Sequence, residues 1–155
     1  MAVQLAKHFG AFVIATASQS KHPYLQSLGV DQLIDYKTTD FTQVVRDVDL
    51  VLDVIGSGYA QRSFEVLKPG GLLVTAVERT STELPKLAAS LGRRFGGLGV
   101  EPDYYALEKL AALVEKGELV PHVEKEFSLA DIGEAHTAIE TGSTMGKIAI
   151  RIRQE

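Results

Sequence analysis

The chain alternates short apolar runs with longer segments whose apolar residues recur at helical spacing. Apolar runs rich in β-branched residues are typical of buried strands, and apolar positions at i, i+3 and i+4 indicate helices that pack on them. We expect strands at residues 12–17, 32–36, 48–55, 72–77, 123–127 and 147–152. We expect helices at about residues 2–9, 22–28, 41–46, 59–67, 84–91, 103–116 and 128–141. Strict alternation of this kind predicts an α/β fold of right-handed βαβ units, with a parallel sheet covered by helices on both faces.

Glycine and proline mark the breaks between these elements. Gly10, Gly29 and Gly117 follow predicted helices, as expected of helix C-termini. Lys68–Gly71, with the sequence KPGG, is expected to form a turn before the strand at 72–77. The glycine-rich stretch 93–100 is expected to supply an edge strand.

The N-terminal residues allow a second interpretation. Lys7 precedes an apolar stretch that ends Ala15–Ala17, which is similar to a short secretory signal with its cleavage site. However, Ala2, Leu5, Ala6 and Phe9 fall on one helical face. We therefore favour a helix followed by a separate strand.

Composition excludes several classes of protein. The chain has 155 residues, 45% hydrophobic and 23% charged, which is enough for a folded core. Its net charge of -4 has the wrong sign for bulk neutralisation of phosphates, so no nucleic acid partner is expected. The absence of cysteine excludes disulfides and Cys-based zinc sites. The longest apolar run, Ala11–Ala15, is far shorter than the roughly 18 residues of a membrane span, so we expect no membrane partner and a cytoplasmic location.

Ligands of open parallel sheets bind beyond the carboxyl ends of the strands. The residues at these ends are Ala17–Ser18, Tyr36, Val54–Gly56 and Ala76–Val77. In a dinucleotide-binding fold, an acid about 20 residues after the glycine-rich turn binds the ribose 2'-hydroxyl of NAD. Ser18 stands at that position, and Lys21 follows it. A hydroxyl and a cation favour NADP over NAD. From composition alone, however, the more common interpretation is that Ser18 begins a polar loop and Lys21 is a surface charge.

The phosphate-binding turn itself is not found in this chain. Counting back about 20 residues from Ser18 reaches Met1 or a position before it. Gly56–Ser57–Gly58 follows the wrong strand for that role. The predicted fold is therefore a Rossmann-like, doubly wound and mostly parallel sheet, truncated at its N-terminus, without the first strand and the GxGxxG turn.

Other catalytic patterns give no site. The four histidines are scattered without metal-ligand spacing, and neither a GxSxG nor a GxxxxGK[ST] motif occurs. Asp49 and Asp53 lie on one predicted strand, but aspartates at strand ends more often accept bonds from the backbone than act in catalysis. No catalytic residue and no metal ligand is predicted.

The order of motifs along the chain resembles the zinc-independent medium-chain dehydrogenases/reductases, in their quinone oxidoreductase-like branch. The resemblance covers nearly the whole chain and matches the C-terminal part of that family. It is carried by the segments AVQLAKHFGAFVIATAS, SLGVDQLIDY, DLVLDVIG, VLKPGGLLV, VEPD, LVEKGELVPHVEKEFSLADIGEAH and GKIAIRI.

This resemblance implies hydride transfer from NADPH to a quinone, an enone or a similar activated double bond. It implies that Ser18, Lys21 and Tyr36 surround the adenosine 2'-phosphate. The backbone of Val54, Ile55 and Gly56, and that of Ala76 and Val77, would run along the ribose and nicotinamide. The nicotinamide end would also contact Leu98, although Phe95–Gly97 is less bulky than is usual there.

The resemblance also implies what the chain lacks. The substrate-binding lobe of the family is absent, so the polypeptide alone is expected to be inactive. Residues 1–118 would form an incomplete dinucleotide-binding domain, and residues 119–155 a segment that packs back toward the substrate lobe. Because the missing strand would lie between 12–17 and 48–55, we expect those strands to come together or the chain to form a homodimer or strand-exchanged oligomer.

Two other functions stay open from the sequence. An S-adenosylmethionine-dependent methyltransferase shares the LKPGGLLV pattern, but it needs an acid where Ser18 stands. A non-enzymatic nucleotide-sensing or interaction module would need none of the missing parts.

Overall fold

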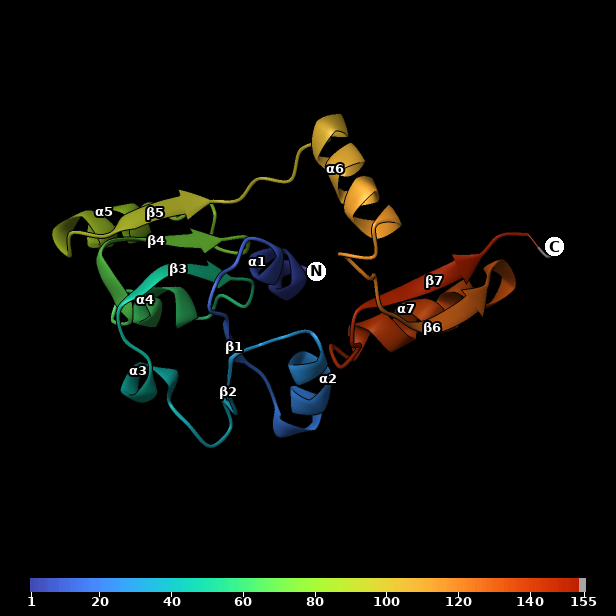
Figure 1. The fold of residues 1–155 in the computed structure, drawn as a ribbon, viewed down its shortest axis with the longest axis horizontal. Coiled ribbons are helices and arrows are strands. Elements are labelled where there is room, and N and C mark those ends of the chain that lie inside the picture. The colour runs from blue at the N-terminus through green and yellow to red at the C-terminus, as the bar shows by residue number, and fades with distance from the viewer. Residues whose placement is uncertain (154–155) are drawn as a thin grey trace. The chain divides into compact units, whose positions relative to one another are not determined.

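The computed structural model describes residues 1–153 and has the predicted α/β class (Figure 1). The chain divides into two compact units. The first unit combines Met1–Leu33 with the chain from Asp103 onward, and the second unit is Ile34–Pro102. The predicted boundary between a cofactor domain (1–118) and a segment that packs toward the substrate lobe (119–155) refers to a longer protein, and it stays a prediction.

The first unit contains the N-terminal and C-terminal elements. These are α1 (Ala2–His8), β1 (Ile14–Thr16), α2 (His22–Ser27), α6 (Tyr104–Glu115), β6 (Val123–Ser128), α7 (Ile132–Glu140) and β7 (Lys147–Arg151). Strands β6 and β7 pair in parallel. Strand β1 pairs with β2 (Gln32–Ile34), which leads into the second unit.

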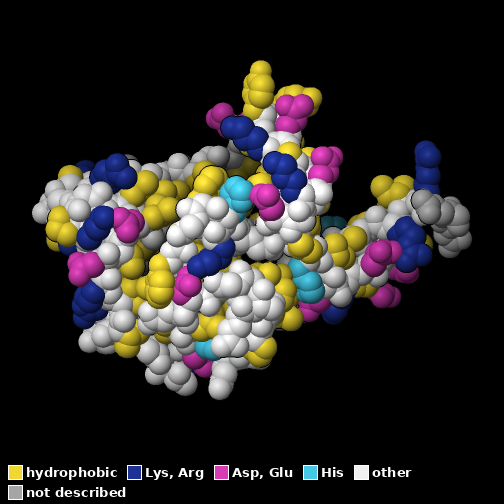
Figure 2. Space-filling view, viewed as in Figure 1, with side chains coloured by type: hydrophobic (Ala, Val, Ile, Leu, Met, Phe, Trp, Pro, Cys, Tyr) yellow, Lys and Arg dark blue, Asp and Glu magenta, His cyan; other side chains and the backbone are white. Residues whose placement is uncertain are grey.

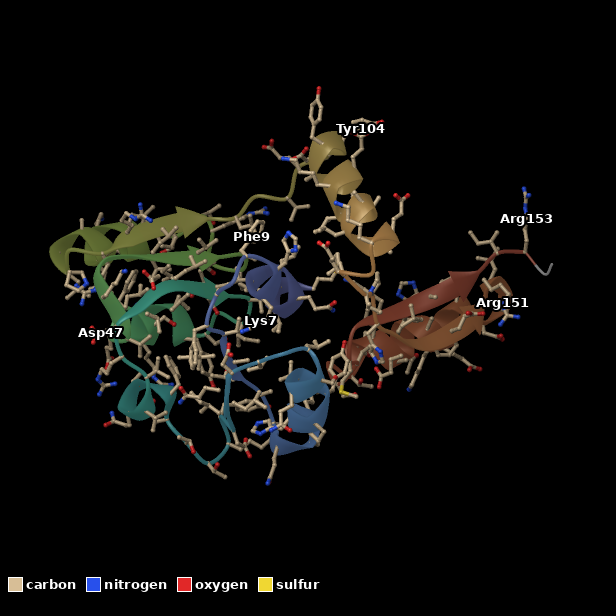
Figure 3. All side chains as sticks on the ribbon, viewed as in Figure 1. Lys7, Phe9, Asp47, Tyr104, Arg151 and Arg153 are labelled. Carbon is tan, nitrogen blue, oxygen red and sulfur yellow. The ribbon has the colours of Figure 1, made fainter. Side chains whose placement is uncertain are left out.

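Side chains of α1 join the two sequence segments of the first unit. The Gln4 side-chain amide donates to the Val120 carbonyl at 3.0 Å and accepts from the Val120 N–H at 2.8 Å. It thus satisfies both backbone groups of Val120, as a neighbouring strand does in a sheet. Lys7, labelled in Figure 3, forms an ion pair with Asp31 at 2.7 Å. Helix α1 therefore connects residues that are more than one hundred positions apart in the chain.

The second unit is a parallel three-stranded sheet with helices. Its elements are α3 (Phe41–Val44), β3 (Val48–Asp53), α4 (Tyr59–Ser63), β4 (Leu67–Thr75), α5 (Glu83–Ser90) and β5 (Arg94–Gly97). The strand order is β3-β4-β5. Its buried core consists of Ala60, Phe64, Leu67, Leu73, Leu84 and Ala88. Phe64 and Leu73 are almost completely buried, so α4 and the middle strand carry the centre of this core.

The two faces of this sheet differ at β3. Val51 is paired with Leu73 and packs against the core. Leu50 and Leu52 point to the other face, as alternate positions of a strand must, and are 57% and 46% exposed. Strand β3 thus carries apolar side chains at the surface as well as in the core.

The KPGG segment corrects one predicted boundary. Lys68–Gly71 was expected as a turn, but it lies within β4. Val48 is paired with Leu67 and Leu50 with Leu72, so the extra residues of β4 form a bulge opposite β3. Gly70 has φ +73 within this bulge, a conformation that favours glycine. The turn-forming residues therefore interrupt the ladder without ending the strand.

Several predicted buried faces are more exposed than expected. The strand at 12–17 was expected to be buried on both faces, yet Phe12 is 71% exposed. On α6, Leu110 and Leu113 are half-buried, whereas Leu107 is exposed. On α7 only Ala135 is buried. Apolar and charged side chains mix at the surface of α6, from which Tyr104 projects (Figures 2 and 3).

Within residues 1–153, β1 pairs with β2 and β3 pairs with β4, so β1 and β3 belong to separate sheets. None of the described helices is long and apolar enough to cross a membrane.

Candidate functional site

The carboxyl ends of β3 and β4 are joined by a buried carboxylate and a buried hydroxyl. Asp53 and Thr75 are paired in register and are 5% and 0% exposed. The Thr75 hydroxyl donates to Asp53 Oδ2 at 2.9 Å. Asp53 Oδ1 accepts from the N–H groups of Ile55 and Gly56 at 3.0 and 3.1 Å. The expectation that Asp53 accepts bonds from backbone donors is confirmed.

Thr75 extends this network to the second loop. Its Oγ1 accepts from the N–H groups of Val77 and Glu78 at 3.3 and 3.2 Å. The Asp53 carbonyl also accepts from the Ala76 N–H at 3.0 Å. Both loops are therefore fixed to the same pair of side chains.

Gly56 allows the two loops to approach closely. It is buried and has φ +72, and a Cβ added to it would meet Val77 Cγ1 at 3.0 Å. An L side chain would suffer both backbone strain and this contact. Glycine at this position is required by the geometry.

The structure gathers six of the predicted cofactor residues at this edge of the sheet. Val54, Ile55, Gly56, Ala76 and Val77 follow β3 and β4 directly, and the Leu98 N–H donates to the Thr75 carbonyl at 2.8 Å. The side chains of Val54, Ile55, Val77 and Leu98 are exposed. We call these six residues the rim. The rim presents apolar side chains to solvent above a buried polar network.

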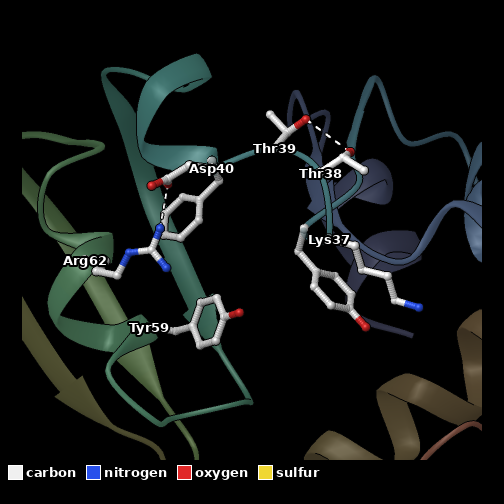
Figure 4. A pocket seen from close by; sticks show the side chains of 8 residues that line it. Lys37, Thr38, Thr39, Asp40, Tyr59 and Arg62 are labelled. Atoms are coloured by element: carbon white, nitrogen blue, oxygen red, sulfur yellow. Dashed lines mark hydrogen bonds and ion pairs between the residues drawn. The ribbon is translucent and has the colours of Figure 1, made fainter.

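Tyr36 lies at a different cavity of the second unit. This cavity encloses about 270 Å³ (Figure 4). It is lined by Tyr36, Lys37, Thr38, Thr39, Asp40, Phe41, Tyr59 and Arg62. The Tyr59 N–H donates to the Gly56 carbonyl at 3.1 Å, so the first turn of α4 connects this cavity to the rim.

Arg62 organises the aromatic side of that cavity. Its guanidinium lies 5.1 Å from the Phe41 ring centroid and 5.6 Å from that of Tyr59, within cation–π range. The two rings are stacked with an interplanar angle of 21°. Asp40 pairs with Arg62 at 2.6 Å (Figure 4). The guanidinium is thereby held in one orientation.

Asp40 also caps α3. Its Oδ1 accepts from the Thr42 N–H and from the Thr42 hydroxyl, both at 2.9 Å. These two bonds, and then the Arg62 charge, hold the pKa of Asp40 below its usual value of 3.8. The folded state therefore favours the ionised carboxylate more than the unfolded state does.

We expect Asp40 to make stability dependent on pH under acidic conditions. Because its pKa is lower in the folded state, its contribution is present above pH 3.8 and is lost as the pH falls through the folded-state pKa. Asp40→Asn should therefore lose less unfolding free energy than the wild type between about pH 6 and about pH 2.5. Urea unfolding at both pH values measures this difference. An equal loss in both proteins would contradict the assignment.

Ser18 and Lys21 share a tight turn of the first unit. The 3₁₀ turn Gln19–Lys21 follows Ser18, and the Lys21 N–H donates to the Ser18 carbonyl at 2.9 Å. The Ser18 hydroxyl lies 3.3 Å from that of Ser20. Lys21 forms no ion pair within the part of the chain that the structure describes. A hydroxyl and a cation are thus placed together on one turn.

Sequence reasoning missed the partners of these residues. Thr75 was included only as part of an apolar strand, and nothing in its neighbours indicates that its hydroxyl reaches Asp53. Phe41, Tyr59 and Arg62 were assigned to helices without a role. Phe41 and Tyr59 begin α3 and α4, and Arg62 lies in the last turn of α4, so their proximity becomes visible only when the fold brings those helices together.

Comparisons with known proteins show which family the chain is similar to. Residues 28–150 match the sequence profile of a family described as zinc-binding dehydrogenase. The chain is 34% identical to 2-methylene-furan-3-one reductase of Solanum lycopersicum, over 97% of this chain and 36% of that protein. It is 32% identical to the chloroplastic NADPH-dependent alkenal/one oxidoreductase of Arabidopsis thaliana, with the same coverage.

A solved structure shows the same fold. The quinone oxidoreductase from Coxiella burnetii superposes with a TM-score of 0.91 and 33% sequence identity, over 98% of this chain and 48% of that chain. The chain therefore spans about half, or less, of the length of the proteins it matches.

Proposed function

Because the chain belongs to the zinc-binding dehydrogenase family, we propose that it is the cofactor-binding part of an NADPH-dependent oxidoreductase. The substrate class would be a quinone, an enone or a similar activated double bond. The names of its relatives support this proposal, since they include an alkenal/one oxidoreductase and a quinone oxidoreductase. Family membership favours this reaction over the methyltransferase alternative. The reaction would require the rest of a longer protein.

The observation that carries the choice of NADPH is the turn at Ser18. It places a hydroxyl and the cation Lys21 together, without a carboxylate to bind a free ribose 2'-hydroxyl. Tyr36 lines a separate cavity of the second unit, in which Arg62 is paired with the Asp40 carboxylate. The hydroxyl and the cation of the Ser18 turn suit a 2'-phosphate, which is anionic and rich in acceptor oxygens.

The rim is proposed to lie along the ribose and nicotinamide of the same cofactor. When bound, NADPH supplies the hydride. The residues of this chain would bind and orient it: Val54, Ile55 and Gly56 after β3, Ala76 and Val77 after β4, and Leu98 after β5. The exposed apolar side chains of Ile55 and Val77 would exclude water from the nicotinamide.

The residues of this chain do not fit a zinc ion, despite the family description. The sequence has no cysteine, and the described residues contain no group of three His, Asp or Glu that could hold a metal. Zinc in proteins needs three or four such ligands. The proposed function therefore uses no metal held by this chain.

Calorimetric titration of the chain with NADPH, NADH and S-adenosylmethionine tests the proposal. Binding of NADPH in preference to NADH would support it. Binding of S-adenosylmethionine alone would replace it with the methyltransferase alternative. If none of the three binds, the cofactor-binding role of the isolated chain is wrong.

Replacing Lys21 with glutamate should weaken NADPH binding at least about tenfold, because it places a negative charge beside the 2'-phosphate. NADH lacks that phosphate, so its affinity should change little. Calorimetric titration with both cofactors measures the two effects. Lys109→Glu, an exposed change of the same charge on α6, serves as the control. Equal losses for NADPH and NADH would contradict the role of Lys21.

We also propose that the chain associates with a second copy of itself, and that it is cytoplasmic. The first proposal is supported by β3, because among the described residues it is an edge strand and its Leu50 and Leu52 side chains are exposed. Unpaired apolar strand edges favour pairing with another chain.

A further inference from the structure

We infer that Asp53 and Thr75 are positioning residues that determine which hydrogen-bonding groups the rim offers to a ligand. Their side chains accept hydrogen bonds from N–H groups of both loops, while four carbonyl oxygens of these loops receive no hydrogen bond from the described part of the chain. The rim then recognises hydrogen-bond donors, such as sugar hydroxyls or a primary amide, in preference to phosphate. This inference rests on the proposed cofactor-binding function and adds a specificity to it.

Four backbone N–H groups of the two loops are already hydrogen-bonded to side chains. Ile55 and Gly56 donate to Asp53 Oδ1, and Val77 and Glu78 donate to Thr75 Oγ1. All four are therefore occupied before any ligand arrives. Phosphate sites in proteins use free backbone N–H groups that point at the anion. None of these four N–H groups is free to bind an anion.

Four carbonyl oxygens of the same loops have no hydrogen-bond donor among the described residues. Within residues 1–153, the carbonyls of Val54, Ile55, Ala76 and Val77 accept no hydrogen bond. A carbonyl oxygen that is left without a donor is an available acceptor. The loops thus offer acceptors, and a ligand that binds there gains most from its own hydroxyl or amide donors.

Asp53 and Thr75 together can bond to both loops and to each other. A carboxylate has two oxygens, so Asp53 can accept from one loop and from Thr75 together. The Thr75 hydroxyl donates to Asp53 and still accepts from the other loop. Removing the hydroxyl while keeping the shape would free two N–H groups and change the loop after β4.

Amide hydrogen exchange of the unliganded chain tests the positioning role directly. In the wild type, the amides of Ile55, Gly56, Val77 and Glu78 should all be protected. In Thr75→Val, the amides of Val77 and Glu78 should exchange at least about tenfold faster. Thr75→Ser should restore their protection. Thr42→Val removes another buried threonine hydroxyl that bonds to an aspartate, and it should leave all four amides unchanged.

Calorimetric titration then tests the ligand specificity. Thr75→Val should weaken NADPH binding about fivefold to tenfold, with Thr75→Ser close to the wild type. Adenosine 2',5'-bisphosphate, which lacks the nicotinamide and its ribose, should bind equally well to all variants.

The two measurements separate the possible failures. Unprotected amides in the wild type, or protection that Thr75→Val leaves intact, would overturn the positioning role whatever the cofactor result. Equal losses for NADPH and the bisphosphate would overturn the ligand specificity. Protected amides with no NADPH binding by the wild type would overturn the proposed function and the ligand specificity, and would retain the positioning role.

Discussion

Phe64→Ala is expected to lower the free energy of unfolding by about 3–5 kcal/mol. Phe64 is 1% exposed and lies in the core of the second unit with Leu73 and Leu84. Truncation to alanine removes buried apolar area and leaves a cavity that α4 and β4 can close only in part. Urea unfolding followed by circular dichroism suits the measurement, because the chain contains no tryptophan.

Phe9→Ala is the matched control for this change. Phe9 is 81% exposed, so the same substitution should change the unfolding free energy by less than about 0.5 kcal/mol. A loss of less than about 1 kcal/mol for Phe64→Ala would show that the core around α4 is not packed as described.

Leu52→Lys is expected to weaken self-association of the chain at least about tenfold. Leu52 is the last but one residue of β3, and its side chain is exposed on the face opposite the core. A lysine there adds a charge to the surface that a second copy would cover, without changing the buried residues beneath. Light scattering over a range of protein concentrations gives the dissociation constants of the wild type and the variant.

Val44→Lys provides the control for this second prediction. Val44 is exposed to a similar extent but belongs to α3 and not to β3. It should leave the dissociation constant unchanged. A wild-type chain that stays monomeric at all concentrations would contradict the proposed association.

The sequence predicts the order and type of the elements well, because each one has a local signal. The helix at α6 begins where the Asp103 carboxylate accepts from the Ala106 N–H at 3.0 Å, and it ends before Gly117. The strand at β3 contains the apolar run Leu50–Leu52, and Gly56 follows the segment. Signals of this kind depend only on neighbouring residues, so they can be detected without the fold.

Burial and the polar network could not be predicted in the same way. The apolar pattern of β3 is the same for Val51, which packs against the core, and for Leu52, which is exposed. The role of Asp53 in binding backbone donors follows from its position at a strand end, but its bond to Thr75 crosses 22 residues. Contacts between distant segments depend on strand register, which local patterns do not specify.

The bulge in β4 makes the pairing register of its first residue with β3 independent of the register of its last four residues. From Leu72 to Thr75 the pairing with β3 is continuous, whereas Leu67 joins the ladder on the far side of the extra residues. A deletion or insertion within Lys68–Gly71 would therefore change the size of the bulge and leave Thr75 opposite Asp53. The number of residues in this bulge can therefore vary among related proteins while Asp53 and Thr75, which hold the rim loops, stay paired.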